Sequence, residues 1–243
     1  MNSQPLQSYL LPGGGYGYTA APVETLTSFE NTLALGLLDE SGSTGSFARQ
    51  MELCQKEIIK SLRHSPRADN LIYRHCHFGT NFREHHGWVP LGQISEDQYD
   101  GCYQPGGQTA LYDSCDRVIR EMLDYAQKQA AQKYLCNGII YIMTDGRDLG
   151  STLRERDVKT ALGTAIASEA LESLITILIG VNDDASIQAD LQKFAHNVGF
   201  TQYIPLKDAS EKSLAKLANF ISKSISAQSQ ALGTGGPSQS LTF

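Results

Sequence analysis

Several features that mark large protein classes are missing from this sequence. Its longest apolar stretches, such as residues 33–38 and 174–179, are far shorter than the roughly 18 residues needed to cross a bilayer, so no membrane span is expected. The first residues, Met-Asn-Ser-Gln-Pro, lack the basic flank and apolar core of a secretion signal. Basic residues number 20 against 26 acidic ones and do not cluster, which argues against nucleic acid as a partner.

Paired cysteines are also missing. The chain has five cysteines, an odd number, and none forms a Cys-x-x-Cys pair. This spacing favours neither a disulfide framework nor a structural zinc site, so we predict five free thiols and a cytoplasmic location. Cys54 and Cys115 fall on the apolar faces of predicted helices, where cysteine acts as a small core residue.

The length of 243 residues suits one domain with additional segments at its ends. We predict a Gly/Pro-rich N-terminal arm at 1–29, a domain at 30–226 and a flexible Ser/Gln/Gly-rich tail at 227–243 with an apolar tip. Glycines at 13–17 are not followed by Gly-Lys-Ser/Thr, so they do not indicate a phosphate loop. A flexible or packed arm without regular structure is expected there.

Within the predicted domain, short apolar runs alternate with segments of helical periodicity. The runs predict strands at 33–38, 71–78, 82–89, 138–143, 174–179 and 202–205; the periodicity predicts helices at 47–62, 111–126, 153–171, 187–198 and 214–225. Strands buried on both faces and alternating with helices indicate a parallel sheet covered on both sides. The predicted fold class is α/β, an open doubly wound, mostly parallel sheet with one antiparallel edge hairpin, joined at residues 79–81.

Oxygen-bearing side chains follow two of these strands and precede one helix. Asp39, Ser41 and Ser43 come after the first strand, Asp145 follows the strand at 138–143, and Thr109 follows a glycine pair. Ligands of doubly wound sheets bind at the carboxyl ends of the strands, so the five side chains should converge. A set made only of oxygen donors suits a hard cation, which predicts a Mg²⁺ site, with Mn²⁺ or Ca²⁺ as alternatives.

The pattern Asp-x-Ser-x-Ser, the later Thr109 and the Asp145 of Thr-Asp-Gly resemble the metal-ion-dependent adhesion site of von Willebrand factor A (vWA) domains of the intracellular type. The resemblance covers roughly residues 30–226. It implies that Ser41, Ser43 and Thr109 ligate the metal directly and that Asp39 and Asp145 act mainly through waters.

Simpler interpretations exist for each of these residues. Asp39, Ser41 and Ser43 are residue types that begin helices, Thr109 could cap the next helix, and Asp145-Gly146 could be only a turn.

Two further acidic residues lie beside the motif. Glu40 departs from the small or apolar residue often found there in the family, which alters the local charge without removing a ligand. Asp113 shares a helix face with Thr109 and could either support the metal site or act as a cap.

A separate group of histidines raises a zinc hypothesis. His75 and His77 point to one face of a predicted strand, and the hairpin could bring His85 opposite them, with Cys76 and His86 adjacent in sequence. The commoner alternative is a polar face on an edge strand.

The function predicted from the resemblance is a cytoplasmic, metal-dependent protein-protein interaction module. As an adaptor or assembly component, it would bind an Asp or Glu of a protein partner through Mg²⁺, and a component of an ATPase-containing complex is one such partner. We expect no enzyme activity, no catalytic residues and no organic cofactor. The alternative is a Mg²⁺-dependent phosphatase or phosphotransferase, although Ser41 stands where that chemistry would need a second Asp. A third reading is a scaffold whose metal site is vestigial.

Overall fold

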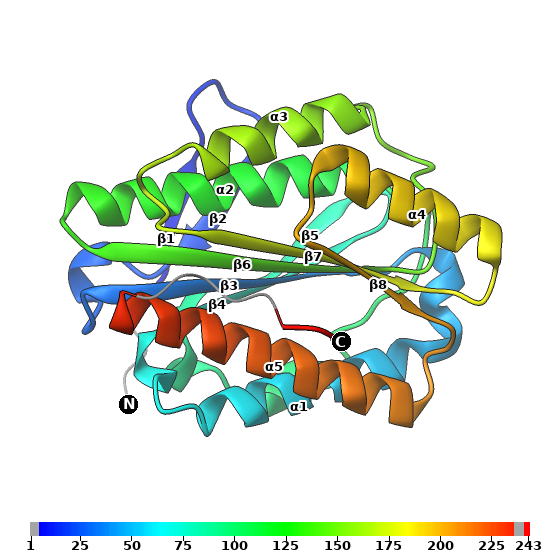
Figure 1. The fold of residues 1–243 in the computed structure, drawn as a ribbon, viewed down its shortest axis with the longest axis horizontal. Helices are drawn as coiled ribbons and strands as arrows, with labels where there is room; N and C mark the ends of the chain where they lie inside the picture. Colours follow the sequence, from blue (N-terminus) through cyan, green and yellow to red (C-terminus); the bar gives the residue numbers. More distant parts are fainter. Residues whose placement is uncertain (1–4, 236–240) are drawn as a thin grey trace.

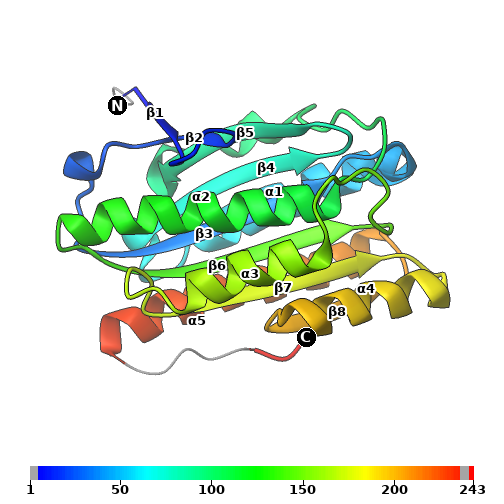
Figure 2. The same cartoon turned by 90° about the horizontal axis from the view of Figure 1, so that it is seen from above.

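A computed structural model describes residues 5–235 and 241–243 of the chain. Across these residues, eight strands form one sheet in the order β1-β2-β5-β4-β3-β6-β7-β8 (Figure 2). The strands are β1 (Gln7–Leu10), β2 (Gly17–Ala20), β3 (Glu30–Asp39), β4 (Leu71–Phe78), β5 (Phe82–Pro90), β6 (Leu135–Thr144), β7 (Leu174–Val181) and β8 (Gln202–Leu206). Two pairs, β1 with β2 and β4 with β5, are antiparallel, and the other pairs are parallel.

Five α-helices in the described residues cover both faces of this sheet (Figure 1). On one face lie α1 (Ala48–Arg63) and α5 (Glu211–Thr234). On the other lie α2 (Leu111–Ala131), α3 (Glu155–Ile166) and α4 (Ala185–Val198). The predicted fold class, an open and mostly parallel α/β sheet, is confirmed. The hairpin joined at residues 79–81 lies inside the sheet, however, and the edge hairpin is β1-β2.

The central strand β3 shows why the apolar runs form buried strands. Successive side chains of a strand point to opposite faces, so Leu35 and Leu37 enter one core and Leu38 the other. The chain leaves β3 for β4 on one side and later returns to pair β6 on the other. The carboxyl ends of β3 and β6 therefore lie at the point where strand order reverses, which is the usual binding position in such sheets.

The prediction that residues 5–22 lack regular structure is wrong. The glycine run is the turn of the β1-β2 hairpin, where Gly13, Gly14 and Gly15 have φ angles of 97°, 69° and 128°. This hairpin extends the sheet beyond β5 through the pairing of Ala20 with Trp88. The hydroxyl of Tyr18 donates to the carboxylate of Asp124 at 2.6 Å and ties the hairpin to α2.

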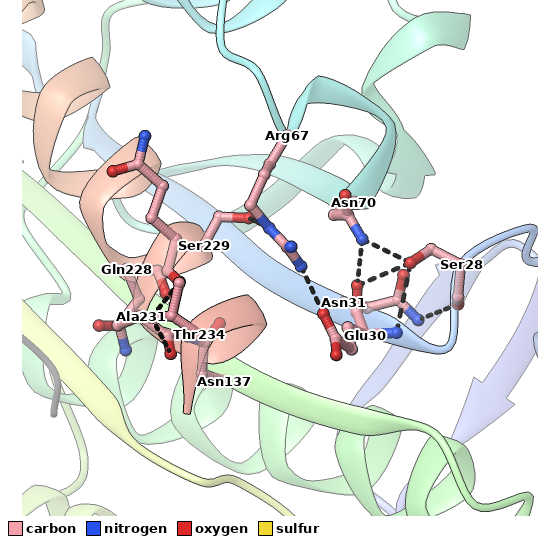
Figure 3. Close-up of polar contacts among 11 residues, drawn as sticks. Ser28, Glu30, Asn31, Arg67, Asn70, Asn137, Gln228, Ser229, Ala231 and Thr234 are labelled. Atoms are coloured by element: carbon pink, nitrogen blue, oxygen red, sulfur yellow. Dashed lines mark hydrogen bonds and ion pairs between the residues drawn. The ribbon is translucent and has the colours of Figure 1, made fainter. Parts of the chain in front are cut away.

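The C-terminal segment also differs from its prediction as a flexible tail from residue 227. Helix α5 continues to Thr234, and Ser229 accepts a hydrogen bond from Arg67 Nε at 3.2 Å (Figure 3). The same Arg67 pairs with Glu30 at 2.8 Å, so it links α5 to the start of β3. Residues 236–240 of the predicted tail lie outside the described residues, while Leu241 and Phe243 pack against the core beneath α1 and α5.

All five cysteines are buried and free. Of the helices that the structure describes, none has the length and apolar composition that crossing a membrane requires.

Candidate metal centre

Asp39 is the last residue of β3, and its side chain is 1% exposed. One carboxylate oxygen accepts a hydrogen bond from the backbone N–H of Ser41 at 2.8 Å, and the other accepts from the hydroxyl of Thr144 at 2.6 Å. Thr144 ends β6, so these bonds join the carboxyl ends of two neighbouring parallel strands.

The two serines continue the arrangement from Asp39 toward Asp145. Ser41 Oγ lies 3.3 Å from Ser43 Oγ, and Ser43 Oγ donates to Asp145 Oδ1 at 2.9 Å. Their side chains thus face the second carboxylate, and in the described chain neither makes a hydrogen bond that caps the following helices. The helix-cap interpretation of this segment does not fit this geometry.

Thr109 belongs to a third loop that is tied to the first by backbone hydrogen bonds. Gly42 N–H donates to the carbonyl of Gly107 at 3.2 Å, and Gly106 N–H donates to the carbonyl of Glu40 at 2.8 Å. Thr109 is 4% exposed, and α2 begins after it with Ala110, not Thr109, at the N-cap position. All five predicted residues therefore come from three connected loops at one edge of the sheet.

The electrostatics of the centre favour a bound cation. Burial raises the pKa of Asp39 to about 6, against the lowering effect of the hydrogen bonds from Ser41 and Thr144 and with a further increase from the charge of Asp145. Burial also raises the pKa of Asp145. Among the described residues, no Lys, Arg or His forms an ion pair with either carboxylate. Two buried carboxylates linked through Ser41 and Ser43, with Thr109 in the adjoining loop, offer the oxygen donors that a hard divalent ion prefers.

Glu40 faces away from this set. Its carboxylate accepts hydrogen bonds from Arg83 Nε at 3.1 Å and Nη2 at 2.5 Å, and from the backbone N–H of Gln104 at 3.3 Å. Arg83 therefore compensates the charge that distinguishes this chain from the family pattern. Both side chains line an open groove of about 510 Å³ beside the three loops.

Asp113 makes no hydrogen bond to the five predicted residues in the described structure. Its carboxylate accepts from the backbone N–H groups of Thr152, at 3.0 Å, and Leu153, at 2.8 Å. Asp113 therefore fastens the loop before α3 to the start of α2, and in the described residues it neither caps a helix nor bonds to the proposed metal ligands.

The histidines do not lie on an edge strand, so that alternative is wrong. β4 lies between β3 and β5, and His75 and His77 are 0% exposed.

A substitution at Gly107 tests whether the backbone of the third loop must keep its position for metal binding. Its φ is +76°, and a Cβ there would lie 2.3 Å from Thr80 Oγ1. We expect Gly107→Ala to lower the free energy of unfolding by about 1–3 kcal/mol and to weaken metal binding by displacing Thr109. Thermal melting and calorimetric titration with Mg²⁺ would measure both effects.

The matched control is Gly106→Ala, because a Cβ at Gly106 meets no atom within 4 Å. Equal behaviour of the two variants would contradict the strict placement of this loop.

Comparison with known proteins gives a likeness of fold only. No protein-family model matches the chain, and no curated protein matches its sequence. The PilB minor pilin of Streptococcus sanguinis is similar with a TM-score of 0.61 and 14% identity over 87% of this chain and 64% of the pilin. The pilus adhesin SpaC of Lactobacillus rhamnosus GG gives a TM-score of 0.59 and 11% identity over 82% of this chain and 30% of the adhesin.

A third solved structure carries a metal. Proximal thread matrix protein 1 of the mussel byssus, described with a zinc-occupied MIDAS (metal-ion-dependent adhesion site) motif, gives a TM-score of 0.52 and 17% identity over 80% of this chain and 45% of that protein. The chain thus spans less than two thirds of each of these proteins. Their shared fold is vWA-like.

Proposed function

We propose that this chain is a metal-dependent protein-protein interaction module that uses Asp39, Ser41, Ser43, Thr109 and Asp145. The observation that carries the proposal is the pair of buried carboxylates of Asp39 and Asp145, 1% and 6% exposed, which are linked through Ser41 and Ser43 and have no ion pair with a protein cation in the described residues. The zinc-occupied MIDAS motif of the mussel protein supports a metal on this fold. We propose Mg²⁺ for this chain because every donor is oxygen.

A metal held here would supply a coordination position for a carboxylate from outside. The two Asp residues only balance the charge of a divalent ion, so an Asp or Glu of a partner can still be attracted. Asp39 is fixed by two hydrogen bonds, while Ser43 is exposed at the surface. The fold therefore fixes the buried donor Asp39, while the surface around Ser43 is open to a partner.

We propose that the chain is an adaptor or assembly component and not an enzyme. A phosphatase or phosphotransferase would need a second acid, or a cation placed on the phosphate. Arg147, the nearest cation in sequence, instead pairs with Asp190 and donates to Ser186 Oγ at 2.7 Å. The cytoplasmic location and a partner in an ATPase-containing complex stay predictions.

The test is to capture partners on the immobilised chain in Mg²⁺, in Ca²⁺ and in EDTA. Capture should require metal and should be weaker in Ca²⁺, which prefers more ligands and longer bonds than Mg²⁺. Thr109→Ala should remove a ligand and reduce capture, while Ser46→Ala, an exposed serine of the same loop outside the motif, should not. If neither EDTA nor Thr109→Ala reduces the amount of partner captured, the interface lies elsewhere on the chain.

A further inference from the structure

A second group of metal-binding side chains lies beneath the groove, on the face of the sheet covered by α1 and α5. His75 and His77 come from β4, and Cys102 comes from the loop that leads to α2. Their potential ligand atoms all lie within 4.8 Å of one another. Cys102 is 6% exposed and both histidines are 0% exposed, so the group is buried.

The ring nitrogens of His75 and His77 are unpaired within the part of the chain that the structure describes. All four nitrogens are buried without a hydrogen-bond partner in the described structure. The Nδ1 of His77 is 3.3 Å from Glu40 but makes no hydrogen bond with it, and that carboxylate is already held by Arg83. A buried polar atom left unpaired costs about 1–3 kcal/mol, so four such atoms in one place require an explanation.

A neighbouring histidine shows that the local fold can satisfy an imidazole. One ring nitrogen of His86 lies 3.0 Å from the carbonyl of Gly87, and the other lies 2.8 Å from the hydroxyl of Tyr99. His75 and His77 instead have aromatic rings beside them, those of Tyr99 at 5.2 Å and Tyr103 at 4.9 Å between centroids. The unpaired nitrogens of His75 and His77 are therefore free to act as ligands, although hydrogen-bond partners for an imidazole exist close by.

We propose that His75, His77 and Cys102 form a buried site for zinc or a similar transition metal. Two imidazoles and a thiolate are borderline-soft donors that select Zn²⁺ over Mg²⁺. Ligand atoms around tetrahedral zinc lie about 3.3–3.8 Å apart, so small side-chain rotations close the present spacing. The ring of His85, 5.6 Å from that of His75 and 5.9 Å from that of His77, is the neighbour available for a fourth ligand, with water as the other choice.

The protonation of the three side chains is compatible with a metal site. Burial lowers the pKa of His75 and of His77 well below the usual value, so both are neutral, which is the form that binds metals. Burial raises the pKa of the Cys102 thiol to about 12, so metal binding must release its proton and should strengthen as pH rises.

The position of Cys102 gives this site a structural role. Cys102 precedes Gly106, Gly107 and Thr109 in one loop, and Gly106 N–H donates to the carbonyl of Glu40. A metal bound to β4 and Cys102 would fasten this loop to the sheet and so help to place Thr109. The two sites are distinguishable because only the second contains sulfur.

Titration of the metal-free protein with Co²⁺ tests the proposal. Cobalt bound to a thiolate gives a near-ultraviolet charge-transfer band, which an all-oxygen site cannot give. The band should appear in the wild type, in Asp39→Asn and in Cys136→Ser, which replaces an equally buried cysteine outside the cluster. It should be absent in Cys102→Ser, and Zn²⁺ should displace it in the wild type.

His77→Gln keeps the thiol and provides a second test if Cys102→Ser fails to fold. This variant should bind Co²⁺ at least tenfold more weakly, with circular dichroism confirming its fold. A wild type without the band, or a band that persists in Cys102→Ser or keeps its strength in folded His77→Gln, would overturn the proposal. Loss of the band in Asp39→Asn would also overturn the assignment of two separate sites.

Discussion

Mg²⁺ at one hundred times its dissociation constant should raise the free energy of unfolding by about 2.7 kcal/mol, which corresponds to roughly 5–10 °C in Tm for a chain of this size. The reason is that the folded state alone brings together Asp39, Ser43 and Asp145. Thermal melting in Mg²⁺ and in EDTA measures the difference. Equal Tm values would contradict the metal centre.

Asp39→Asn should abolish this gain and also stabilise the metal-free protein at neutral pH. The pKa of Asp39 is raised from 3.8 to about 6, so the folded state binds this proton more tightly than the unfolded state. The penalty is absent below pH 4, grows as pH rises from 4 to 6, and reaches about 3 kcal/mol above that range. In EDTA the wild type should therefore lose stability between pH 4 and 6, and D39N should lose less.

The matched control is Asp183→Asn, an exposed carboxylate in the loop after β7 at the same edge of the sheet. It should keep the response to Mg²⁺ and the pH profile of the wild type. A D39N protein that still gains stability from Mg²⁺ would show that the cation binds at another place.

The sequence predicts the strands and helices whose hydrophobic pattern lies within one short segment of the chain. The apolar run of β3 must be buried on both faces, and the helical spacing of Leu111, Cys115 and Val118 fits the face that α2 buries. The parallel direction of most strands then follows from the alternation, because parallel strands need crossover connections, usually helices. Placing Asp39 and Asp145 at one sheet edge required nothing beyond this pattern.

The parts that were not predicted depend on contacts between distant residues. Strands β1 and β2 are four residues each, and β2 joins the sheet only through its pairing with β5. The end of α5 is polar in sequence, yet Gln228 is buried. Its side-chain amide nitrogen donates to Ser173 Oγ at 2.8 Å, and its backbone carbonyl accepts from Asn137 Nδ2. Cys102 could not be grouped with His75 from sequence, since only the path of the loop brings them together.

A buried ion-pair network on β4 was likewise invisible in the sequence. Arg74 is 0% exposed and lies 2.7 Å from Glu121 of α2, also 0% exposed, and 2.6 Å from Glu84 of β5. Arg117 completes the network by pairing with Glu121 at 2.9 Å and donating to the carbonyl of Gly17 in the N-terminal hairpin. The network therefore joins the sheet, α2 and the hairpin, with Arg74 and Glu121 fully buried at its centre.

Arg74→Met should lower the free energy of unfolding by about 3–5 kcal/mol, because it leaves the carboxylate of Glu121 buried with only Arg117 as a partner. Denaturant unfolding measures the loss, and adding Glu121→Leu should recover part of it by removing the stranded charge. The control is Lys60→Met, which breaks an exposed pair with Glu57 and should change stability by less than about 1 kcal/mol. Equal losses in R74M and K60M would mean that water reaches the Arg74 network and screens it as it does a surface pair.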